Sequence, residues 1–215
     1  MSKFDYVFFD MDGCLVDSER IYCDAWLETF MKYNIPIQYE TIMSWRGLGF
    51  MEIVDDINQY TKNREFAISL KDIRDELFWE KLAKNEVYLK HYALEFMQWL
   101  DDHHIPYACV TSTFRYKAER ILKHFELHDR FQFIVYGDQV ERTKPYPDVY
   151  LKAIELSNMD KHKILVFEDS YNGMLACNRA DLNVVYIPDM LKESYPDIKI
   201  YAQLESFESA TPLFD

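Results

Sequence analysis

Short apolar segments recur along this chain, and each one ends in polar or turn-forming residues. They predict five strands, at residues 7–9, 105–110, 131–135, 164–167 and 184–187. Between the later strands, apolar positions follow a helical period over about 91–103, 115–126, 147–157 and 171–180. Strands that alternate with helices at this pace favour right-handed βαβ units and a parallel sheet with helices on both faces.

Residues 17–85 interrupt this alternation. Their apolar positions keep a helical period, for example at Ile21 and Phe30, and the stretch contains no convincing strand. We therefore expect an all-helical cap domain at 17–85, inserted into an α/β core formed by 1–16 and 86–215. The predicted fold class is α/β: a Rossmann-like, doubly wound parallel sheet with an inserted all-α cap domain.

The composition narrows the possible partners. Of the 215 residues, 49% are hydrophobic and 28% are charged, which is typical of an ordinary globular protein. The formal charge of −13 disfavours nucleic acid, because phosphates bind to basic surfaces. No basic flank precedes an apolar stretch near the start, and no apolar run approaches a membrane span. We expect a cytoplasmic protein with no nucleic-acid or membrane partner.

The four cysteines, Cys14, Cys23, Cys109 and Cys177, are scattered, with no Cys-x-x-Cys and no cluster with histidine. This pattern predicts free thiols in a reducing compartment, not a disulfide framework or a zinc site. Cys14 is set apart because it lies beside an acidic pair, where an exposed thiol would be open to oxidation.

The most informative segment runs from Phe8 to Gly13, where an apolar strand leads directly into two carboxylates and a glycine. Because side chains alternate along a strand, Asp10 and Asp12 are expected on one face, roughly 6–7 Å apart, with room for one small tetrahedral group. Gly13 allows a sharp turn that leaves both acids at the carboxyl end of the strand, where open parallel sheets place their active sites. Paired acids also cap loops, so this segment alone leaves both interpretations open.

Two further strand ends carry groups that bind anions. Thr111, Ser112 and Thr113 follow the second strand, at the start of a predicted helix whose amides favour an anion; the alternative is a plain helix cap. Lys144 precedes Pro145 in a turn that has a second proline two residues later. Such a turn would aim the ammonium at a phosphate, whereas most loop lysines are simply solvated.

The fourth strand ends in Glu168 and Asp169, adjacent carboxylates that would repel each other and lose hydration. A cation would relieve this repulsion; the alternative is that the acids cap the helix that follows. Oxygen ligands from few carboxylates, completed by water, favour Mg²⁺ over Zn²⁺ or Ca²⁺. The acids, hydroxyls and lysine at these strand ends together predict a phosphoryl-transfer site, where positioning and charge neutralisation supply most of the catalysis.

In this order, these residues resemble the motifs of the haloacid dehalogenase superfamily. FFDMDGCLVDSE is similar to its first motif, VTST to its second, KPYPDVY to its third and VFEDSYNGMLA to its fourth, over residues 4 to about 187. The helical insertion after the first motif resembles the β-phosphoglucomutase-like branch, which includes many phosphatases of small metabolites.

The resemblance implies a role for each core residue. Asp10 would be the nucleophile that forms an aspartyl-phosphate. Asp12 would be the general acid for the leaving alcohol and then the general base for water. Thr111, the amide of Ser112 and Lys144 would hold the phosphoryl oxygens.

The resemblance also implies a metal site. Mg²⁺ would be held by Asp10, Asp169 and the main-chain carbonyl of Asp12, with Glu168 as a further ligand or as an acid just beyond the ligands. The dehalogenases of the superfamily lack the second acid of the first motif. Asp12 therefore favours phosphate-ester chemistry.

The predicted cap carries a loop at 44–50 that resembles the substrate-specificity loop of this branch. Arg46, with Gly47 beside it, would contact the substrate; the alternative is that Arg46 pairs with surface acids. The mutases of the branch place a histidine where this chain has Tyr22 and an arginine where it has Phe50. Both differences favour a hydrolase.

We therefore expect a monomeric, Mg²⁺-dependent phosphatase that acts on a small-molecule phosphate monoester, with sugar phosphates among the candidate substrates. One alternative is a hexose-phosphate mutase of the β-phosphoglucomutase type. A more remote alternative is a non-catalytic, receiver-like phosphate-binding module.

Overall fold

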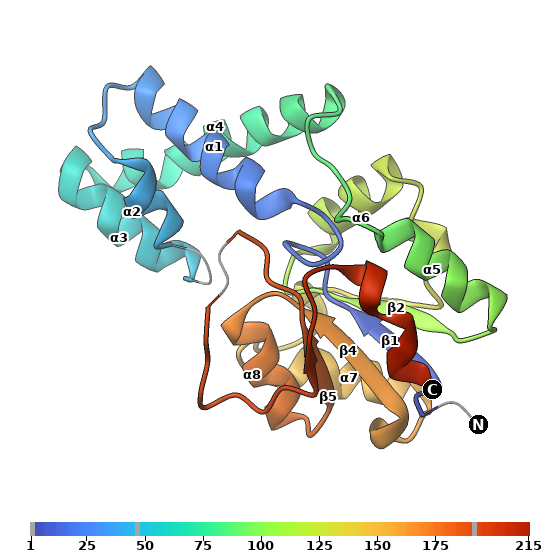
Figure 1. The fold of residues 1–215 in the computed structure, drawn as a ribbon. Helices are drawn as coiled ribbons and strands as arrows, with labels where there is room; N and C mark the ends of the chain where they lie inside the picture. The colour runs from blue at the N-terminus through green and yellow to red at the C-terminus, as the bar shows by residue number, and fades with distance from the viewer. Residues whose placement is uncertain (1–2, 46–47, 191–192) are drawn as a thin grey trace. The chain divides into compact units, whose positions relative to one another are not determined.

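The computed structural model describes residues 3–45, 48–190 and 193–215. The chain forms two compact units (Figure 1). One unit contains Met1–Asp17 and Leu89–Asp215, and the other is Ser18–Tyr88. Among the described residues, no helix combines the length and the apolar character that crossing a membrane requires.

The larger unit is built on a six-stranded sheet in the order β3-β2-β1-β4-β5-β6, and every neighbouring pair is parallel. The strands are β1 (Tyr6–Phe9), β2 (Tyr107–Val110), β3 (Ile134–Val135), β4 (Ile164–Glu168), β5 (Asn183–Tyr186) and β6 (Ala202–Gln203). The predicted α/β class and five strands are confirmed, although β3 is shorter than predicted. The sequence pattern missed β6, because this two-residue strand has no apolar run.

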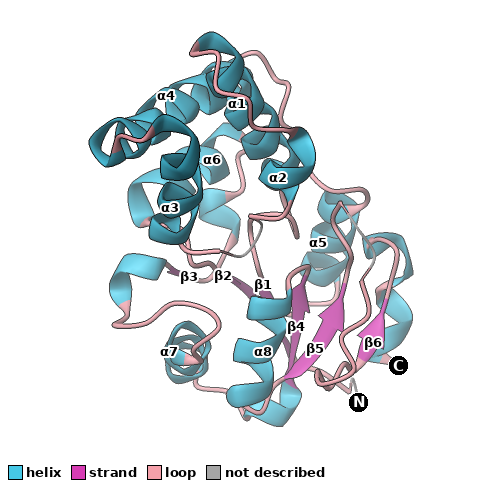
Figure 2. Ribbon diagram, turned by 90° about the vertical axis from the view of Figure 1, so that its left-hand side faces the viewer, coloured by secondary structure: helices cyan, strands magenta, loops and turns pink. Residues whose placement is uncertain are grey.

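Helices cover both faces of this sheet. In Figure 2, α7 and α8 lie on one side of the strands and α5 on the other. The helices of this unit are α5 (Ala93–Asp102), α6 (Arg115–His124), α7 (Asp148–Ser157) and α8 (Tyr171–Arg179). Short 3₁₀ turns occur at η1 (His128–Arg130), η2 (Gly137–Gln139), η3 (Lys161–Lys163), η4 (Phe207–Ser209) and η5 (Thr211–Phe214).

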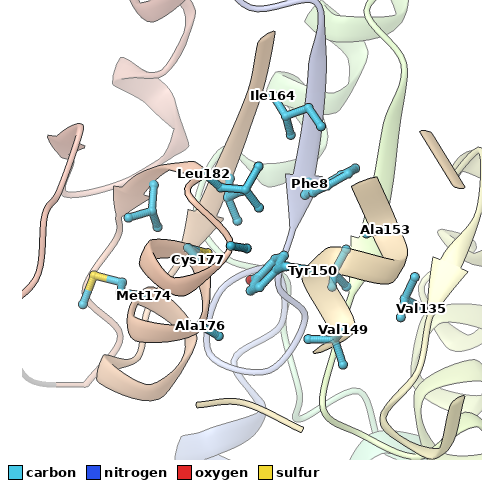
Figure 3. Packing of buried hydrophobic residues seen from close by; sticks show 14 of the residues in the cluster. Phe8, Val135, Val149, Tyr150, Ala153, Ile164, Met174, Ala176, Cys177 and Leu182 are labelled. Atoms are coloured by element: carbon cyan, nitrogen blue, oxygen red, sulfur yellow. The ribbon is translucent and has the colours of Figure 1, made fainter. Parts of the chain in front are cut away.

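The alternation of side chains along the strands produces two apolar layers. Phe8 of β1 belongs to a buried cluster with Tyr150 of α7 and Cys177 of α8 (Figure 3). Its neighbour Phe9 points to the other face, where its ring stacks on Phe167 at 5.6 Å and meets Phe96 of α5 edge-on at 6.0 Å. Burial on both faces explains why the central strands are continuous apolar runs.

The smaller unit is entirely helical in its described part. It contains α1 (Ser18–Lys32), α2 (Tyr39–Met43), α3 (Phe50–Thr61) and α4 (Arg64–Ala83). Trp26 stacks on Phe30 at 5.2 Å, and Trp45 packs edge-on against both rings. Tyr22 stacks on Phe78 at 4.2 Å. Aromatic side chains at helical spacing therefore build the core of this unit.

All four cysteines are free and buried. Cys14, which the sequence marked as open to oxidation if exposed, has a fully buried side chain next to the first strand. Burial raises the pKa of this thiol well above its ordinary value, and the neighbouring Asp10 and Asp169 raise it further. Cys14 is therefore held as a neutral thiol, the form that reacts slowly with oxidants.

Candidate active site

The sheet topology brings the predicted site residues to one edge. β1 lies between β2 and β4, so the chain passes to opposite sides of β1 when it forms these two strands. The N–H of Asp10 donates to the carbonyl of Phe167 at 3.0 Å, and the N–H of Thr111 donates to the carbonyl of Val135 at 3.0 Å. Both residues thus continue their strands at the carboxyl end, where ligands bind in open α/β sheets.

Lys144 connects two of the acids at this edge. Its ammonium forms a short contact with Oδ1 of Asp10 and donates to Oε1 of Glu168 at 2.7 Å and to the carbonyl of Val110 at 2.9 Å. The side chains of all three charged residues are less than a tenth exposed. Tyr150 of α7 donates to the same Oε1 of Glu168 at 2.5 Å. This buried network fixes the ammonium directly beside the predicted nucleophile.

The environment perturbs the ionisation of the groups in this network. Burial raises the pKa of Asp10 well above its ordinary value; the Lys144 ammonium opposes this effect, whereas the charges of Glu168 and Asp12 add to it. Burial lowers the pKa of Lys144, but the nearby carboxylates of Asp10 and Glu168 outweigh burial and leave the pKa raised. Lys144 therefore carries a full positive charge at neutral pH.

The acids at this edge also provide a donor set for a cation. Asp10, Glu168 and Asp169 each offer a carboxylate oxygen, and these oxygens lie within 4.8 Å of one another. Gly13 has a φ of +77°, and a Cβ on it would lie 2.3 Å from Oδ2 of Asp169. The glycine therefore leaves space that the Asp169 carboxylate occupies. Three clustered hard oxygen donors are suited to Mg²⁺.

Asp12 is positioned by a loop and not by strand alternation. β1 ends at Phe9, and the chain then turns so that the N–H groups of Leu15 and Val16 both donate to the carbonyl of Met11 at 3.0 Å. The carboxylate of Asp12 accepts a hydrogen bond of 2.7 Å from the hydroxyl of Thr113. The two acids of the first motif therefore have different partners, although they lie close together in the sequence.

The segment after β2 contains the predicted anion-binding hydroxyls. Thr111 is buried, and its Oγ1 accepts a hydrogen bond of 3.0 Å from the N–H of Thr113. Oγ of Ser112 is buried and has no hydrogen-bond partner among the residues that the structure describes. A buried hydroxyl in this state is costly unless a ligand or water binds to it. Both hydroxyls thus suit a bound anion.

Two predicted residues, Arg46 and Gly47, lie outside the described residues. Tyr22 occupies the position where the mutases place a histidine, and it packs within the helical unit, with the guanidinium of Arg74 4.6 Å from its ring centroid. Its ring thus contributes to packing.

The sequence analysis missed two residues that contact predicted site residues, namely Thr113 and Tyr150. Thr113 belongs to the hydroxyl segment after the second strand, but only its two predecessors were assigned to the site. Tyr150 lies in the segment KPYPDVY, where its spacing indicates a core position of a helix. Thr113 contacts a residue 101 positions away and Tyr150 one 18 positions away, so no local pattern identifies either contact.

Comparison with known proteins identifies the family of this chain. Residues 7–187 match the family model of the haloacid dehalogenase-like hydrolases. A phosphorylated carbohydrates phosphatase of Thermotoga maritima is 31% identical over 84% of this chain and 83% of its own length. A (DL)-glycerol-3-phosphatase of Arabidopsis thaliana is 28% identical over 94% of this chain and 71% of its own length.

A solved structure supports the fold independently. The hydrolase of family IA, variant 3, from Entamoeba histolytica superimposes with a TM-score of 0.82 at 21% identity, covering 95% of this chain and 94% of that one. The family match spans most of the chain and includes every core site residue named above. The chain therefore belongs to the haloacid dehalogenase-like hydrolase family and is one of its phosphatases.

Proposed function

We propose that this protein is a Mg²⁺-dependent phosphatase that hydrolyses small phosphate monoesters through an aspartyl-phosphate on Asp10. The observation that carries the proposal is the buried ammonium of Lys144 between Asp10 and Glu168, with Asp169 in the same acidic cluster. A nucleophilic carboxylate, a fixed cation and a group of metal-binding acids together form the equipment that phosphoryl transfer needs.

The first chemical step forms a bond between a carboxylate oxygen of Asp10 and phosphorus, while the bond from phosphorus to the ester oxygen breaks. Asp12 gives its proton to the departing oxygen. Lys144, the hydroxyl of Thr111 and the amide of Ser112 hold the phosphoryl oxygens during this exchange. In the second step water attacks phosphorus, Asp12 takes a proton from that water, and the bond to Asp10 breaks.

The carboxylates of Asp10 and Asp169, with the main-chain carbonyl of Asp12, would hold Mg²⁺. Glu168 is a further ligand or an acid just beyond the ligands. When bound, the cation supplies positive charge that neutralises the phosphoryl oxygens and reduces their repulsion of the incoming carboxylate.

The substrate class follows from the relatives, whose names refer to phosphorylated carbohydrates and to glycerol 3-phosphate. We propose small polyol and sugar phosphates as substrates. The helical unit Ser18–Tyr88 would act as the cap domain predicted at 17–85, with the loop around Arg46 and Gly47 contacting the part of the substrate beyond the phosphate. The protein would act as a monomer in the cytoplasm.

The test is release of inorganic phosphate from a panel that contains glycerol 3-phosphate, hexose 6-phosphates and β-glucose 1-phosphate, with Mg²⁺ and with EDTA. The proposal predicts release that requires Mg²⁺. Conversion of glucose 1-phosphate to glucose 6-phosphate without phosphate release would instead indicate a mutase. Neither reaction with any ester would contradict the proposed activity.

A further inference from the structure

The hydroxyl of Thr113 donates a hydrogen bond to Asp12, the predicted acid–base residue. Its Oγ1 donates to Oδ2 of Asp12 at 2.7 Å, across 101 residues of sequence. Both residues belong to the larger unit, Asp12 in the loop after β1 and Thr113 in the turn after β2. The contact therefore joins the first two motifs of the site.

The backbone of Thr113 is fixed on both sides. Its N–H donates to Oγ1 of Thr111 at 3.0 Å, and its carbonyl accepts from the N–H of Gly137 at 3.1 Å. Gly137 also packs tightly on this turn, because a Cβ on it would lie 2.0 Å from the carbonyl oxygen of Ser112. The turn thus has little room to shift, and the Thr113 hydroxyl has a defined position.

The backbone of Asp12 is fixed as well. Asp12 forms a parallel bridge with Val16, and the N–H of the adjoining Gly13 donates to the carbonyl of Val16 at 2.8 Å. Gly13 lies against the carboxylate of Asp169 and has a left-handed φ, which is strained for any other residue. With the backbone fixed at both residues, the hydrogen bond between them restricts how the Asp12 carboxyl group can turn.

We infer that Thr113 is a positioning residue, which aims Asp12 for proton transfer in the proposed reaction. A carboxyl group that acts as an acid carries its proton on one oxygen, while the other can accept a hydrogen bond. Donation from Thr113 to Oδ2 therefore assigns the transferred proton to Oδ1. In the first step that proton moves to the ester oxygen as the bond from phosphorus to oxygen breaks, and in the second step a proton of water moves back.

A hydroxyl suits this role because it donates a hydrogen bond without carrying a charge. Thr113 can therefore hold the Asp12 side chain while Asp12 gives up a proton in the first step and takes one in the second.

The experiment measures kcat/KM of Thr113→Val and of the unchanged protein on two esters. The substitution removes the hydroxyl with little change in shape. The inference rests on the proposed function and predicts that kcat/KM for glycerol 3-phosphate falls by about tenfold or more, because an alkoxide leaves poorly without a proton. For p-nitrophenyl phosphate, whose leaving group needs no proton, kcat/KM should stay within about twofold. The parameter kcat/KM excludes the later attack of water, so it isolates the step in which the ester bond breaks.

Two further variants serve as controls. Thr113→Ser keeps the hydroxyl and should restore kcat/KM for glycerol 3-phosphate. Ser157→Ala removes a hydroxyl that donates to the carbonyl of Ile154 at the end of α7, and it should leave kcat/KM unchanged for both esters. If Thr113→Val does not fold, Thr113→Ala provides the same comparison.

The outcomes separate this inference from the proposed function. If Thr113→Val loses the same factor of kcat/KM on both esters, or loses none on either, Thr113 has no positioning role. The phosphatase activity of the unchanged protein would still stand. Failure of the unchanged protein to release phosphate from these two esters and from the sugar phosphates of the panel would overturn the proposed function, and the inference with it.

Discussion

The phenolic hydroxyl of Tyr150 donates a 2.5 Å hydrogen bond to Oε1 of Glu168, the oxygen that also receives the ammonium of Lys144 at 2.7 Å. Tyr150 and Glu168 are both fully buried, and the ammonium lies 5.0 Å from the centroid of the tyrosine ring. Burial raises the pKa of Tyr150 well above its ordinary value, so the phenol keeps its proton and remains a donor. A buried side chain of helix α7 thus stabilises the charged site.

This contact predicts that Tyr150→Phe destabilises the protein by about 2 kcal/mol, because a buried carboxylate loses a donor while the ring stays in place. Urea denaturation measures the change. Tyr186→Phe is the matched control, since Tyr186 is equally buried in the same cluster but its hydroxyl accepts a longer bond, 3.4 Å, from the N–H of Glu193. Equal stability changes in the two variants would contradict the importance of the Tyr150 contact.

Gly173 leaves room for the other oxygen of the Glu168 carboxylate. A Cβ on Gly173 would lie 2.0 Å from Oε2 of Glu168, whose other oxygen is held by Lys144 and Tyr150. Alanine is favoured over glycine inside a helix by about 1 kcal/mol, but overpacking a filled site costs about 1–3 kcal/mol. We expect the clash to prevail, because the fixed carboxylate has little freedom to move.

Gly173→Ala should therefore lower both the free energy of unfolding and the phosphatase activity. Gly49→Ala is the control for the change in stability alone, because Gly49 lies in the predicted substrate-specificity loop: the nearest atom to its Cβ is a Glu52 carboxylate oxygen at 3.2 Å, on an exposed side chain. Thermal unfolding and phosphate release measure both effects. A gain in stability for Gly173→Ala would show that Glu168 moves more easily than the geometry indicates.

Much of the fold could be predicted from the sequence, because parallel strands buried on both faces appear as short apolar runs, as in Val7-Phe8-Phe9. The short edge strand β6 could not be predicted, since Ala202-Gln203 is a strand only because it pairs with β5, and its two residues have no apolar pattern. The local sequence also suggested that Asp12 continues the strand, whereas the loop after Phe9 places it. Asp12 is hydrogen-bonded to Thr113, 101 residues away, and Glu168 to Tyr150, 18 residues away. Local sequence patterns do not reveal such contacts.

Buried tyrosines of the larger unit predict a loss of stability at alkaline pH. Burial raises the pKa of Tyr107 to about 12 and that of Tyr136 to about 12, from an ordinary value of 10.0. Since the folded-state pKa is the higher one, their contribution is complete below pH 10 and is lost as the pH rises toward 12. Each tyrosine should remove about 1.4 kcal/mol of stability per pH unit in this window.

Denaturation in urea at a series of pH values tests this expectation. Compared with the unchanged protein, Tyr107→Phe should show a less steep fall in stability as the pH rises from 10 to 12. An unchanged slope for Tyr107→Phe would contradict the expectation for that residue.

Asp169 is proposed as a metal ligand. Asp169→Asn should therefore raise the Mg²⁺ concentration needed for half-maximal activity by about tenfold or more, because loss of a residue that supports a metal site typically weakens metal affinity by at least this factor. Binding of Mg²⁺ without substrate, measured as a rise in the melting temperature, should weaken in parallel. Asp181→Asn, which changes an exposed acid paired with Lys161, is the control. An unchanged metal titration for Asp169→Asn would argue against ligation by this residue.

The central claim is that the carboxylate of Asp10 attacks phosphorus. Its most direct test is phosphate release by the unchanged protein and by Asp10→Asn, assayed with Mg²⁺ on the same esters and accompanied by melting curves. Asparagine has nearly the same shape as aspartate, and the ammonium of Lys144 keeps its ion pair with Glu168, so the variant should stay folded. If Asp10 is the nucleophile, the unchanged protein releases phosphate when Mg²⁺ is present, and Asp10→Asn releases none above background. Full activity in the folded variant would contradict it.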